Sequence, residues 1–385
     1  MSVRASTRPV RVLIVHPSTD LYGSDRVVLA TAVALQRSGC RVVLILPGDG
    51  PLVGAATDLG IEVQQVANPP LRRSFFSVRG LPRLAYGLVR ATPQMIYAVR
   101  RNEPDVILVN TVTLPHWILL GRIARRATIC HLHESEEVAT IVHKALAAPL
   151  LLANAIVVNA DNGMAWLHEA FPVLARRAIR VYNGFPDVPN VPDEPHDGFV
   201  MALVGRISPR KGTAVALEAL AELLARGVDA RLVLAGDSFD GYEWFLDEIR
   251  ARSAKADLAG RVTFTGFVDD PSPVYAGADV VIVPSSVESF GNVAVEAALA
   301  CRPVVASCVG GLREIVQPDT GRLVPPGDAV ALAEAVAALA GDPAGCRALG
   351  RAARASARAR FGVDAFEAGM VGVVHSQRRT RRWRR

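Results

Sequence analysis

Two glutamates bracket a short turn in the second half of the chain. Glu288 and Glu296 stand eight positions apart, with Phe290-Gly291 between them. A carboxylate can accept hydrogen bonds from two neighbouring hydroxyl groups, which suits a ribose or a sugar ring. A pair of carboxylates can also supply the general acid and base of glycoside hydrolysis. The alternative interpretation is that one glutamate caps a helix and the other lies on its surface.

A loop bounded by glycines and rich in positive charge precedes this pair. Gly205 and Gly212 enclose Arg206 and Lys211, directly after an apolar run and directly before a helix-like segment that starts at Thr213. In a parallel sheet such a loop lies at the carboxyl edge of the strands, where helix N-termini present unpaired N–H groups to anions. Arg206 and Lys211 are therefore candidates to clamp a diphosphate. A plain strand-to-helix turn with two solvated cations is the alternative.

Shorter motifs follow other apolar runs of the sequence. They are Gly23-Ser24, His133-Glu134, Asn183-Gly184 and Gly266-Phe267-Val268. The glycine of the first motif would let a backbone approach a ligand closely. A planar base could lie against the exposed backbone of the last motif. Taken singly, each of these motifs is explained equally well as a turn or as a polar strand end.

Short apolar runs alternate with helix-length segments in both halves of the chain, which predicts strands of parallel α/β sheets. The predicted strands are Val12–Val15, Arg41–Leu46, Val106–Asn110, Thr128–His133, Ala155–Asn159, Phe199–Val204, Arg231–Ala235, Val262–Thr265, Val280–Val283 and Pro303–Ala306. Prolines and acidic residues at 186–197 indicate a linker. We therefore expect a first domain at 1–185, a second at 198–362, a C-terminal helix at 363–376 and a basic tail at 377–385.

Composition agrees with two globular domains. Half of the 385 residues are hydrophobic and 21% are charged, and roughly 100–200 residues usually form one domain. The odd number of scattered cysteines, without metal-ligand spacing, indicates reduced core thiols in a cytosolic protein rather than a disulfide frame. These cysteines are Cys40, Cys130, Cys301, Cys308 and Cys346.

Positive charge is concentrated at the end of the chain. Six of the last nine residues, Gln377–Arg385, are arginine, and without them a formal charge of +6 falls to zero. The basicity is therefore a local feature, and we expect no nucleic-acid partner.

A second basic stretch points to a membrane surface. Pro69–Asn102 contains seven arginines and no acidic residue, interleaved with apolar side chains. Such a segment suits the surface of an anionic membrane, and the arginines of the tail would add to its attraction. The alternative is a helix that faces the core and carries solvated arginines. The apolar run Val10–Val15 is too short for a signal peptide or a membrane span, so we expect a cytoplasmic enzyme, held peripherally on the inner face of the membrane.

The order of the motifs points to a known family. In sequence they are Tyr22-Gly23-Ser24, His133-Glu134, Asn183-Gly184, Gly205-Arg206 with Lys211-Gly212, Ala235-Gly236-Asp237, Gly266-Phe267-Val268, and Glu288 to Glu296 with Phe290-Gly291 inside. In this order the chain resembles retaining glycosyltransferase family 4, the glycosyl transferases group 1, over essentially its whole length. The resemblance implies the GT-B fold, with two Rossmann-like doubly wound parallel-sheet domains that face each other across a cleft.

The resemblance also implies roles for individual residues. It gives catalytic roles to Arg206, Lys211, Glu288 and His133. It gives donor-binding roles to Gly23, Ser24, Gly205, Arg206, Lys211, Val268, Glu288, Phe290, Gly291, Asn292 and Glu296. The cations would bind the donor diphosphate and Glu296 the ribose hydroxyls, while Glu288 and the backbone after it would hold the transferred sugar and the β-phosphate. His133 would lie near the reacting centre and Val268 near the base. Many relatives carry two adjacent glycines where this chain has Gly23-Ser24.

The implied reaction moves a sugar from a nucleotide-diphosphate sugar to a glycan, lipid-linked or small acceptor, with retention of configuration. No Asp-x-Asp metal clamp occurs in the sequence, so we expect no metal and no cofactor, and fixed cations would stabilise the leaving phosphate instead. A nucleotide-sugar epimerase or hydrolase of the same fold is one alternative, because a fold does not fix a reaction. A non-catalytic nucleotide-sugar-binding protein is another.

Overall fold

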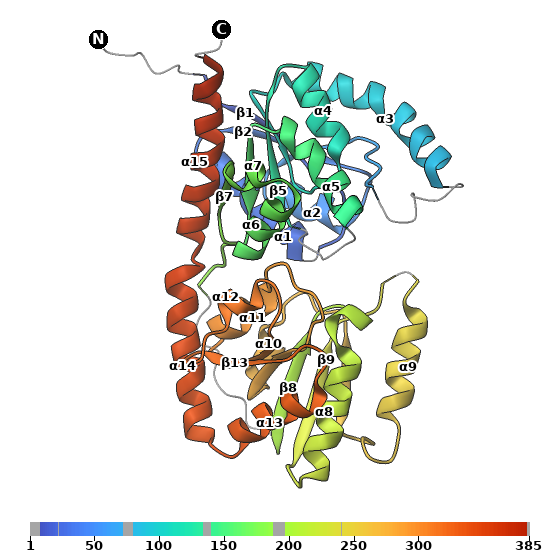
Figure 1. Cartoon of the computed structure of the whole chain (residues 1–385), viewed down its shortest axis with the longest axis vertical. Helices are drawn as coiled ribbons and strands as arrows, with labels where there is room; N and C mark the ends of the chain where they lie inside the picture. Colours follow the sequence, from blue (N-terminus) through green and yellow to red (C-terminus); the bar gives the residue numbers. More distant parts are fainter. Residues whose placement is uncertain are drawn as a thin grey trace. The chain divides into compact units, whose positions relative to one another are not determined.

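The computed structural model describes residues 8–21, 23–71, 80–133, 140–187, 197–239 and 241–382. The chain divides into two compact units (Figure 1). Unit 1 comprises Met1–Gly184 together with Asp364–Arg385, and unit 2 comprises Phe185–Val363.

Unit 1 is built on a seven-stranded sheet in the order β3-β2-β1-β4-β5-β6-β7. Every neighbouring pair is parallel. The strands are β1 (Arg11–Val15), β2 (Arg41–Leu46), β3 (Glu62–Gln65), β4 (Val106–Val109), β5 (Ala127–Leu132), β6 (Ala155–Val158) and β7 (Ala178–Arg180). The central strands β4, β5 and β6 are buried along their whole length, as expected for parallel strands that helices cover on both faces.

Helices cover both faces of this sheet. One face packs against α1 (Gly23–Arg37), α2 (Pro51–Asp58) and α15 (Val363–Arg382). The other face packs against a second group of helices. These are α3 (Gly80–Asn102), α4 (Pro115–Ile123), α5 (Thr140–Ala147), η2 (Ala148–Leu152), α6 (Asp161–Ala170) and α7 (Pro172–Ala175).

The last helix of the chain returns to unit 1. Phe366, Met370 and Val374 of α15 are buried in the same core as β1 and α1. Glycine is required at position 184, because a Cβ there would lie 2.5 Å from Cβ of Phe366. The helix continues to Arg382, past the end that the sequence predicts at residue 376, so the first part of the expected basic tail is helical.

Unit 2 repeats the plan with six strands in the order β10-β9-β8-β11-β12-β13, and all of its pairs are parallel. The strands are β8 (Phe199–Val204), β9 (Ala230–Ala235), β10 (Val262–Gly266), β11 (Val280–Val283), β12 (Val304–Ser307) and β13 (Gly321–Val324). Its helices are η3 (Pro209–Lys211), α8 (Thr213–Ala225), α9 (Glu243–Ser253), α10 (Ser272–Ala276), α11 (Asn292–Leu299), α12 (Leu312–Ile315), α13 (Ala329–Ala340) and α14 (Pro343–Arg360).

The core of unit 2 joins α8, α9 and α13 to one face of the sheet through residues such as Leu220, Ile249 and Leu332. In the part of the chain that the structure describes, no single helix is long and apolar enough to cross a membrane. The pair α13 and α14, bent by 104°, meets those criteria only when its two helices are taken together, by length and composition alone.

The two-sheet α/β fold that the sequence predicts is confirmed, and the differences lie at the edges. Strands β3, β7 and β13 were not predicted, because each is short, partly exposed and, in β3, mostly polar. Asn110, His133 and Asn159 were predicted to end strands, but β4, β5 and β6 stop one residue earlier. Several positions named above lie outside the described residues: Tyr22, residues 72–79, Glu134, residues 188–196 and residues 383–385.

Candidate active site

Lys211 and Glu288 form an ion pair at the carboxyl edge of the unit 2 sheet. Nζ of Lys211 lies 2.6 Å from Oε2 of Glu288, and their side chains are only 20% and 13% exposed. Ser285 also donates a hydrogen bond to this carboxylate, at 3.4 Å. The structure thus brings together two residues that stand 77 positions apart in the sequence.

Glycine fixes the loop that carries Lys211. Gly212 has φ 71°, in the left-handed region, and a Cβ at this position would lie 2.0 Å from the carbonyl oxygen of Pro284. No L-residue with a side chain fits there without moving the backbone. Gly212 therefore holds η3 and the start of α8 against the end of β11, which places Lys211 beside the segment that contains Glu288.

Arg206 lies at the same edge with an aromatic partner. It follows β8, and Cζ of its guanidinium lies 5.5 Å from the ring centroid of Phe239. The amide of Ile207 donates a hydrogen bond to the carbonyl of Asp237, at 3.0 Å. The loop after β9 therefore supports the loop of Arg206. Arg206 thus lies beside Phe239, and Lys211 is paired with Glu288.

Glu296 has a different partner from Glu288. The hydroxyl of Tyr275 donates a hydrogen bond to Oε2 of Glu296 at 2.9 Å, and Tyr275 is 3% exposed. A buried donor of this kind fixes the orientation of a carboxylate. Tyr275 thus contacts Glu296, and Lys211 contacts Glu288.

The turn between the glutamates contributes backbone rather than side chain. Gly291 has φ 113° and precedes α11, which Asn292 opens, and no side chain caps this helix end. Phe290 is buried, stacked on Phe185 at 6.4 Å and edge-on to Phe361 at 5.7 Å. The N–H groups at the start of α11 are therefore the groups of this turn that suit an anion.

The remaining predicted donor-binding residues also lie near strand ends. Val268 is half-buried and lies two residues after β10, and Gly205 directly follows β8. Gly23 and Ser24 lie in the first turn of α1, whereas the sequence predicted a loop there. His133 lies in unit 1, directly after β5.

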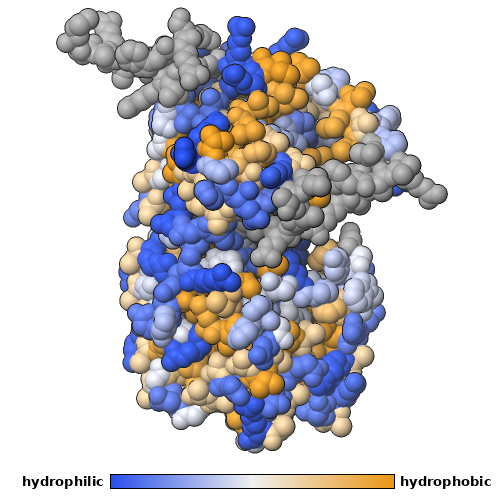
Figure 2. Space-filling model, viewed as in Figure 1, coloured by the Kyte–Doolittle hydropathy of each residue, from blue (hydrophilic) through white to orange (hydrophobic). Residues whose placement is uncertain are grey.

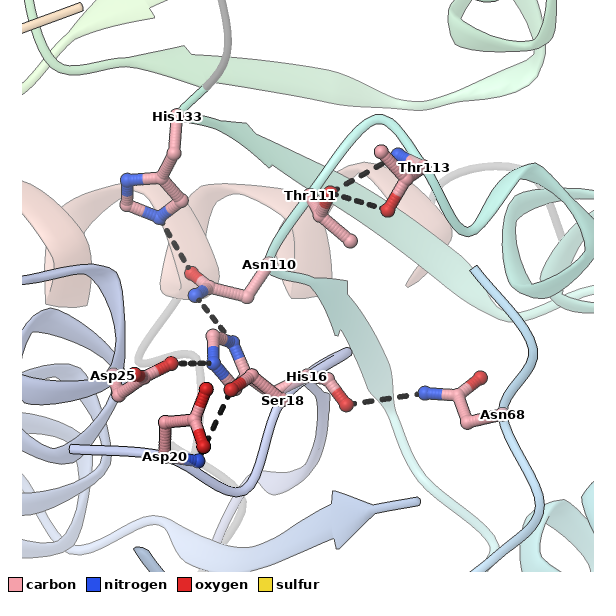
Figure 3. A network of polar contacts seen from close by, with 9 residues as sticks. All are labelled: His16, Ser18, Asp20, Asp25, Asn68, Asn110, Thr111, Thr113 and His133. Atoms are coloured by element: carbon pink, nitrogen blue, oxygen red, sulfur yellow. Dashed lines mark hydrogen bonds and ion pairs between the residues drawn. The ribbon is translucent and has the colours of Figure 1, made fainter. Parts of the chain in front are cut away.

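A chain of hydrogen bonds in unit 1 ends at His133 (Figure 3). Oδ1 of Asp25 lies 2.6 Å from Nε2 of His16. Nδ2 of Asn110 lies 3.0 Å from Nδ1 of His16, and Oδ1 of Asn110 lies 3.0 Å from Nε2 of His133. We call these four residues the histidine relay. Asp25, His16 and Asn110 are each 1% exposed.

Sequence analysis missed the buried members of the relay. Each lies at a strand end or on a helix, where a single buried His, Asp or Asn usually has a structural role. The available signal was positional: His16, Asn110 and His133 each follow an apolar run, and such runs become neighbouring parallel strands. Tyr275 was missed for a similar reason, since nothing in the sequence pairs it with Glu296.

Burial lowers the pKa values of two histidines at this edge, His131 and His133. Desolvation lowers the pKa of His133 well below its usual value, and the nearby His131 and His16 lower it further. Burial also lowers the pKa of His131 to about 3. The rings of His131 and His133 lie 4.0 Å apart. His131 and His133 of unit 1 therefore resist protonation, whereas the site in unit 2 contains the Lys211–Glu288 ion pair.

Within the described ranges, no group of three or more His, Cys, Asp and Glu side chains is arranged to bind a metal ion.

Comparison with known proteins assigns each half of the chain. Residues 22–187 match the family described as Glycosyltransferase Family 4. Residues 198–342 match the family described as Glycosyl transferases group 1.

Curated relatives match over part of their length. The chain is 38% identical over 186 residues to phosphatidyl-myo-inositol mannosyltransferase of Mycolicibacterium smegmatis, covering 46% of this chain and 45% of the relative. It is 37% identical over 184 residues to 2-deoxystreptamine glucosyltransferase of Streptomyces kanamyceticus, covering 47% and 46%. The chain thus spans just under half of the length of these relatives.

Solved structures match over nearly the whole chain. Anabaena Alr3699/HepE in complex with UDP-glucose superposes with a TM-score of 0.82 at 24% identity, covering 95% of this chain and 99% of that one. Sucrose-phosphate synthase from Thermosynechococcus elongatus gives a TM-score of 0.76 at 23% identity, covering 95% and 98%. At this identity the likeness concerns the fold, which is GT-B. With one family matching each half, the chain belongs to the glycosyltransferases, with a Glycosyltransferase Family 4 domain followed by a Glycosyl transferases group 1 domain.

Proposed function

We propose that the protein is a retaining glycosyltransferase that moves a hexose from a nucleotide-diphosphate sugar to a hydroxyl group of an acceptor. The observation that carries the proposal is the Lys211–Glu288 pair, held at the carboxyl edge of the unit 2 sheet by Gly212. An ammonium group suits a diphosphate and a carboxylate suits sugar hydroxyls. The names of the relatives, which are mannosyl- and glucosyltransferases, support a hexose.

Unit 2 would bind the donor. Arg206 and Lys211 would neutralise the diphosphate, and the N–H groups at the start of α11 would add to this. Glu296, oriented by Tyr275, would accept the ribose hydroxyls. Glu288 would accept hydroxyls of the transferred sugar. The half-buried backbone at Val268 would lie against the base.

The transfer would follow from charge stabilisation. The bond between C1 of the sugar and the β-phosphate oxygen breaks, and its electron pair stays on the nucleoside diphosphate. The acceptor hydroxyl oxygen forms the new bond to C1 on the same face, and its proton passes to the leaving phosphate oxygen. Fixed cations stabilise the phosphate as its negative charge grows. The product then keeps the anomeric configuration of the donor.

The test is a two-step assay on the purified protein. A thermal-shift screen of nucleotide sugars identifies the donor, because a ligand that binds only the folded state raises the melting temperature. That donor is then incubated with and without candidate hydroxyl acceptors, and the product anomer is read by NMR. We expect transfer only with acceptor and an anomer that matches the donor. Turnover of donor alone would favour the epimerase or hydrolase, and tight binding without any turnover would favour a binding protein.

The surface of unit 1 supports a second proposal, peripheral binding to the cytoplasmic face of an anionic membrane. On α3, Leu84, Met95 and Val99 face the core, while Tyr86 and Tyr97 are more than 60% exposed. Arg90 and Arg101 lie one helical turn from these tyrosines and donate hydrogen bonds to their hydroxyls, at 3.2 and 3.3 Å. Figure 2 shows apolar surface in the region where Figure 1 places α3 and α4.

The two faces of α3 differ in a way that supports this proposal. One face is buried, and the other combines aromatic and basic side chains without an acidic residue. Such a face suits an anionic headgroup layer, to which each basic residue contributes on the order of 1 kcal/mol at low salt. Ile123 of α4, 70% exposed, adds apolar surface.

Vesicle sedimentation tests this surface. The protein should pellet with anionic vesicles at low salt and be released at high salt. Charge reversal of Arg83, Arg90 and Arg101 to Glu should abolish most of the binding. The matched control reverses Arg231, Arg250 and Arg347, exposed residues of unit 2, with the same change in net charge. Equal loss in both triple variants would mean that net charge alone, and not α3, drives the binding.

A further inference from the structure

The histidine relay follows the order of the strands in the sheet. His16, Asn110 and His133 are each the first residue after β1, β4 and β5, and these strands are neighbours in that order (Figure 3). Parallel strands end at one edge, so the fold itself places the three side chains in a row. Asp25, in the first turn of α1, closes the row at the His16 end.

Asp25, at the end of the row, determines which ring nitrogen of His16 carries the proton. Oδ1 of Asp25 lies 2.6 Å from Nε2 of His16, and because a carboxylate only accepts hydrogen bonds, Nε2 of His16 is the donor. The amide Nδ2 of Asn110 can only donate, so Nδ1 of His16 must accept from it. The ring proton of His16 therefore lies on Nε2, the nitrogen that faces Asp25.

The side-chain amide of Asn110 determines in turn which ring nitrogen of His133 carries the proton. Once Nδ2 of Asn110 points at His16, its Oδ1 points at His133 and can only accept. Nε2 of His133 must then donate. Asn68 fixes the His16 end as well, because its Nδ2 donates to the carbonyl oxygen of His16 at 3.1 Å and its Oδ1 accepts from the indole of Trp117 at 2.7 Å.

We propose that the histidine relay holds His133 in one tautomer, with the proton on Nε2 and the lone pair on Nδ1. Asp25, His16 and Asn110 are then positioning residues. The tautomer is a property of unit 1 alone. Its catalytic consequence rests on the proposed glycosyltransferase activity.

That consequence concerns the hydrogen bonds that His133 would make to a sugar. With its proton on Nε2, the ring of His133 would use Nδ1 as an acceptor and would not donate from that nitrogen to a sugar hydroxyl. A histidine with the opposite tautomer would donate instead. Two titratable groups face His133, namely His131 and His16. Both disfavour a second proton on the His133 ring. The relay therefore selects hydroxyl recognition over acid catalysis at this residue.

NMR spectroscopy of the protein labelled with ¹⁵N-histidine tests the tautomer directly. The nitrogen shifts of the His133 ring, assigned with a His133→Gln variant, distinguish a proton on Nε2 from a proton on Nδ1. We expect Nε2–H at pH 7 in the wild-type protein. A proton on Nδ1, or fast exchange between the two tautomers, would overturn the proposal. This measurement needs no substrate and no relay variant.

Asp25→Asn tests how the preference is transmitted. An asparagine can turn either its oxygen or its amide to His16, so both directions of hydrogen bonding along the relay become available. We expect the Nδ1–H form of His133 to appear, and kcat to fall by about 10–100-fold with little change in donor KM, by analogy with the outer partners of metal-bound histidines. Thr31→Val is the matched control, because the hydroxyl of this buried residue of α1 donates to the carbonyl of Val27 in its own helix.

The outcomes separate the two proposals. If Asp25→Asn leaves both the tautomer and kcat of the wild type, the relay does not position His133. If Thr31→Val lowers kcat equally, the effect is general destabilisation and the proposal fails. If no variant or wild-type protein transfers sugar while Asp25→Asn still changes the tautomer, the relay stands and the proposed function fails.

Discussion

The two units present different chemistry at equivalent places of the same topology. Strands β1 and β8 are both third in their sheets, and the strands beside them follow in the same sequence order. His16 directly follows β1, whereas Gly205 and Arg206 follow β8. After the next strand in the sheet, unit 1 has Asn110 and unit 2 has Pro284, which packs on Gly212.

The difference shows how one edge can serve two classes of ligand. In unit 1, Asp25, His16 and Asn110 are buried, and their hydrogen bonds fix directions. In unit 2, Lys211 and Glu288 form a partly buried ion pair beside a glycine-supported loop, and such charged groups suit a diphosphate and sugar hydroxyls. Recognition of a sugar hydroxyl depends on the direction of its hydrogen bonds, whereas a leaving phosphate is stabilised by positive charge.

Loss of a cation in unit 2 should have the largest effect. Lys211→Ala and Arg206→Ala should each lower kcat/KM by about 10²–10³-fold, as expected when one fixed donor to a developing negative charge is removed. Initial rates over a range of donor concentrations measure this. Arg210→Ala, an exposed residue of the same loop, is the matched control. Thermal unfolding checks that the variants are folded. If Lys211→Ala and Arg206→Ala both had wild-type rates, the loop would have only a structural role.

Acid should lower the stability of the folded protein through the buried His131 of unit 1. The pKa of His131 is lowered to about 3 in the folded state from an ordinary value of 6.5. The unfolded chain therefore takes up its proton at a higher pH than the folded one, and stability falls as the pH drops below about 6.5. Between pH 7 and pH 5 this single group should cost about 2 kcal/mol of unfolding free energy.

His131→Leu removes this contribution. Neither ring nitrogen of His131 has a hydrogen-bond partner among the described residues, so an apolar side chain should be tolerated. Urea unfolding at pH 7 and pH 5, followed by tryptophan fluorescence, gives the difference, because Trp117 and Trp166 are buried in unit 1. His168→Gln, on the exposed face of α6, serves as the control. If the free energy of unfolding of His131→Leu depended on pH as in the wild type, the lowered pKa of His131 would be contradicted.

The sequence predicted the sheets better than the contacts between side chains. Central strands such as β4 and β11 are continuous apolar runs, so their burial can be predicted from local pattern. Edge strand β3, with the sequence EVQQ, has no such signal and forms because β2 is beside it.

The same limit applies to the candidate site. Gly212 and Lys211 were identified from their place between a strand and a helix. The Lys211–Glu288 and Tyr275–Glu296 contacts span 77 and 21 positions and depend on how the helices pack. The relay was missed because its members lie on three strands and a helix, and no local pattern links them.

A smaller effect is expected from the support of Glu296. Tyr275→Phe keeps the buried ring and removes the hydroxyl that donates to the carboxylate at 2.9 Å. Loss of one such hydrogen bond costs about 1 kcal/mol, so donor KM should rise by about fivefold with kcat nearly unchanged. Steady-state kinetics measure both, and Tyr97→Phe on α3 is a matched hydroxyl deletion in unit 1. A large fall in kcat without a change in KM would move Glu296 from ribose binding to the chemical step.

The smallest expected effect is that of removing metal ions. The proposed enzyme uses Arg206 and Lys211 where many glycosyltransferases use a metal clamp, and the sequence contains no Asp-x-Asp motif. Initial rates should therefore be the same with excess EDTA and with added Mg²⁺ or Mn²⁺. The Lys211→Ala variant sharpens the test, because a metal ion that binds the donor diphosphate could replace part of the lost charge and raise its rate. Complete loss of wild-type activity in EDTA, with recovery on adding Mg²⁺ or Mn²⁺, would show that the cations of unit 2 do not stabilise the leaving phosphate alone.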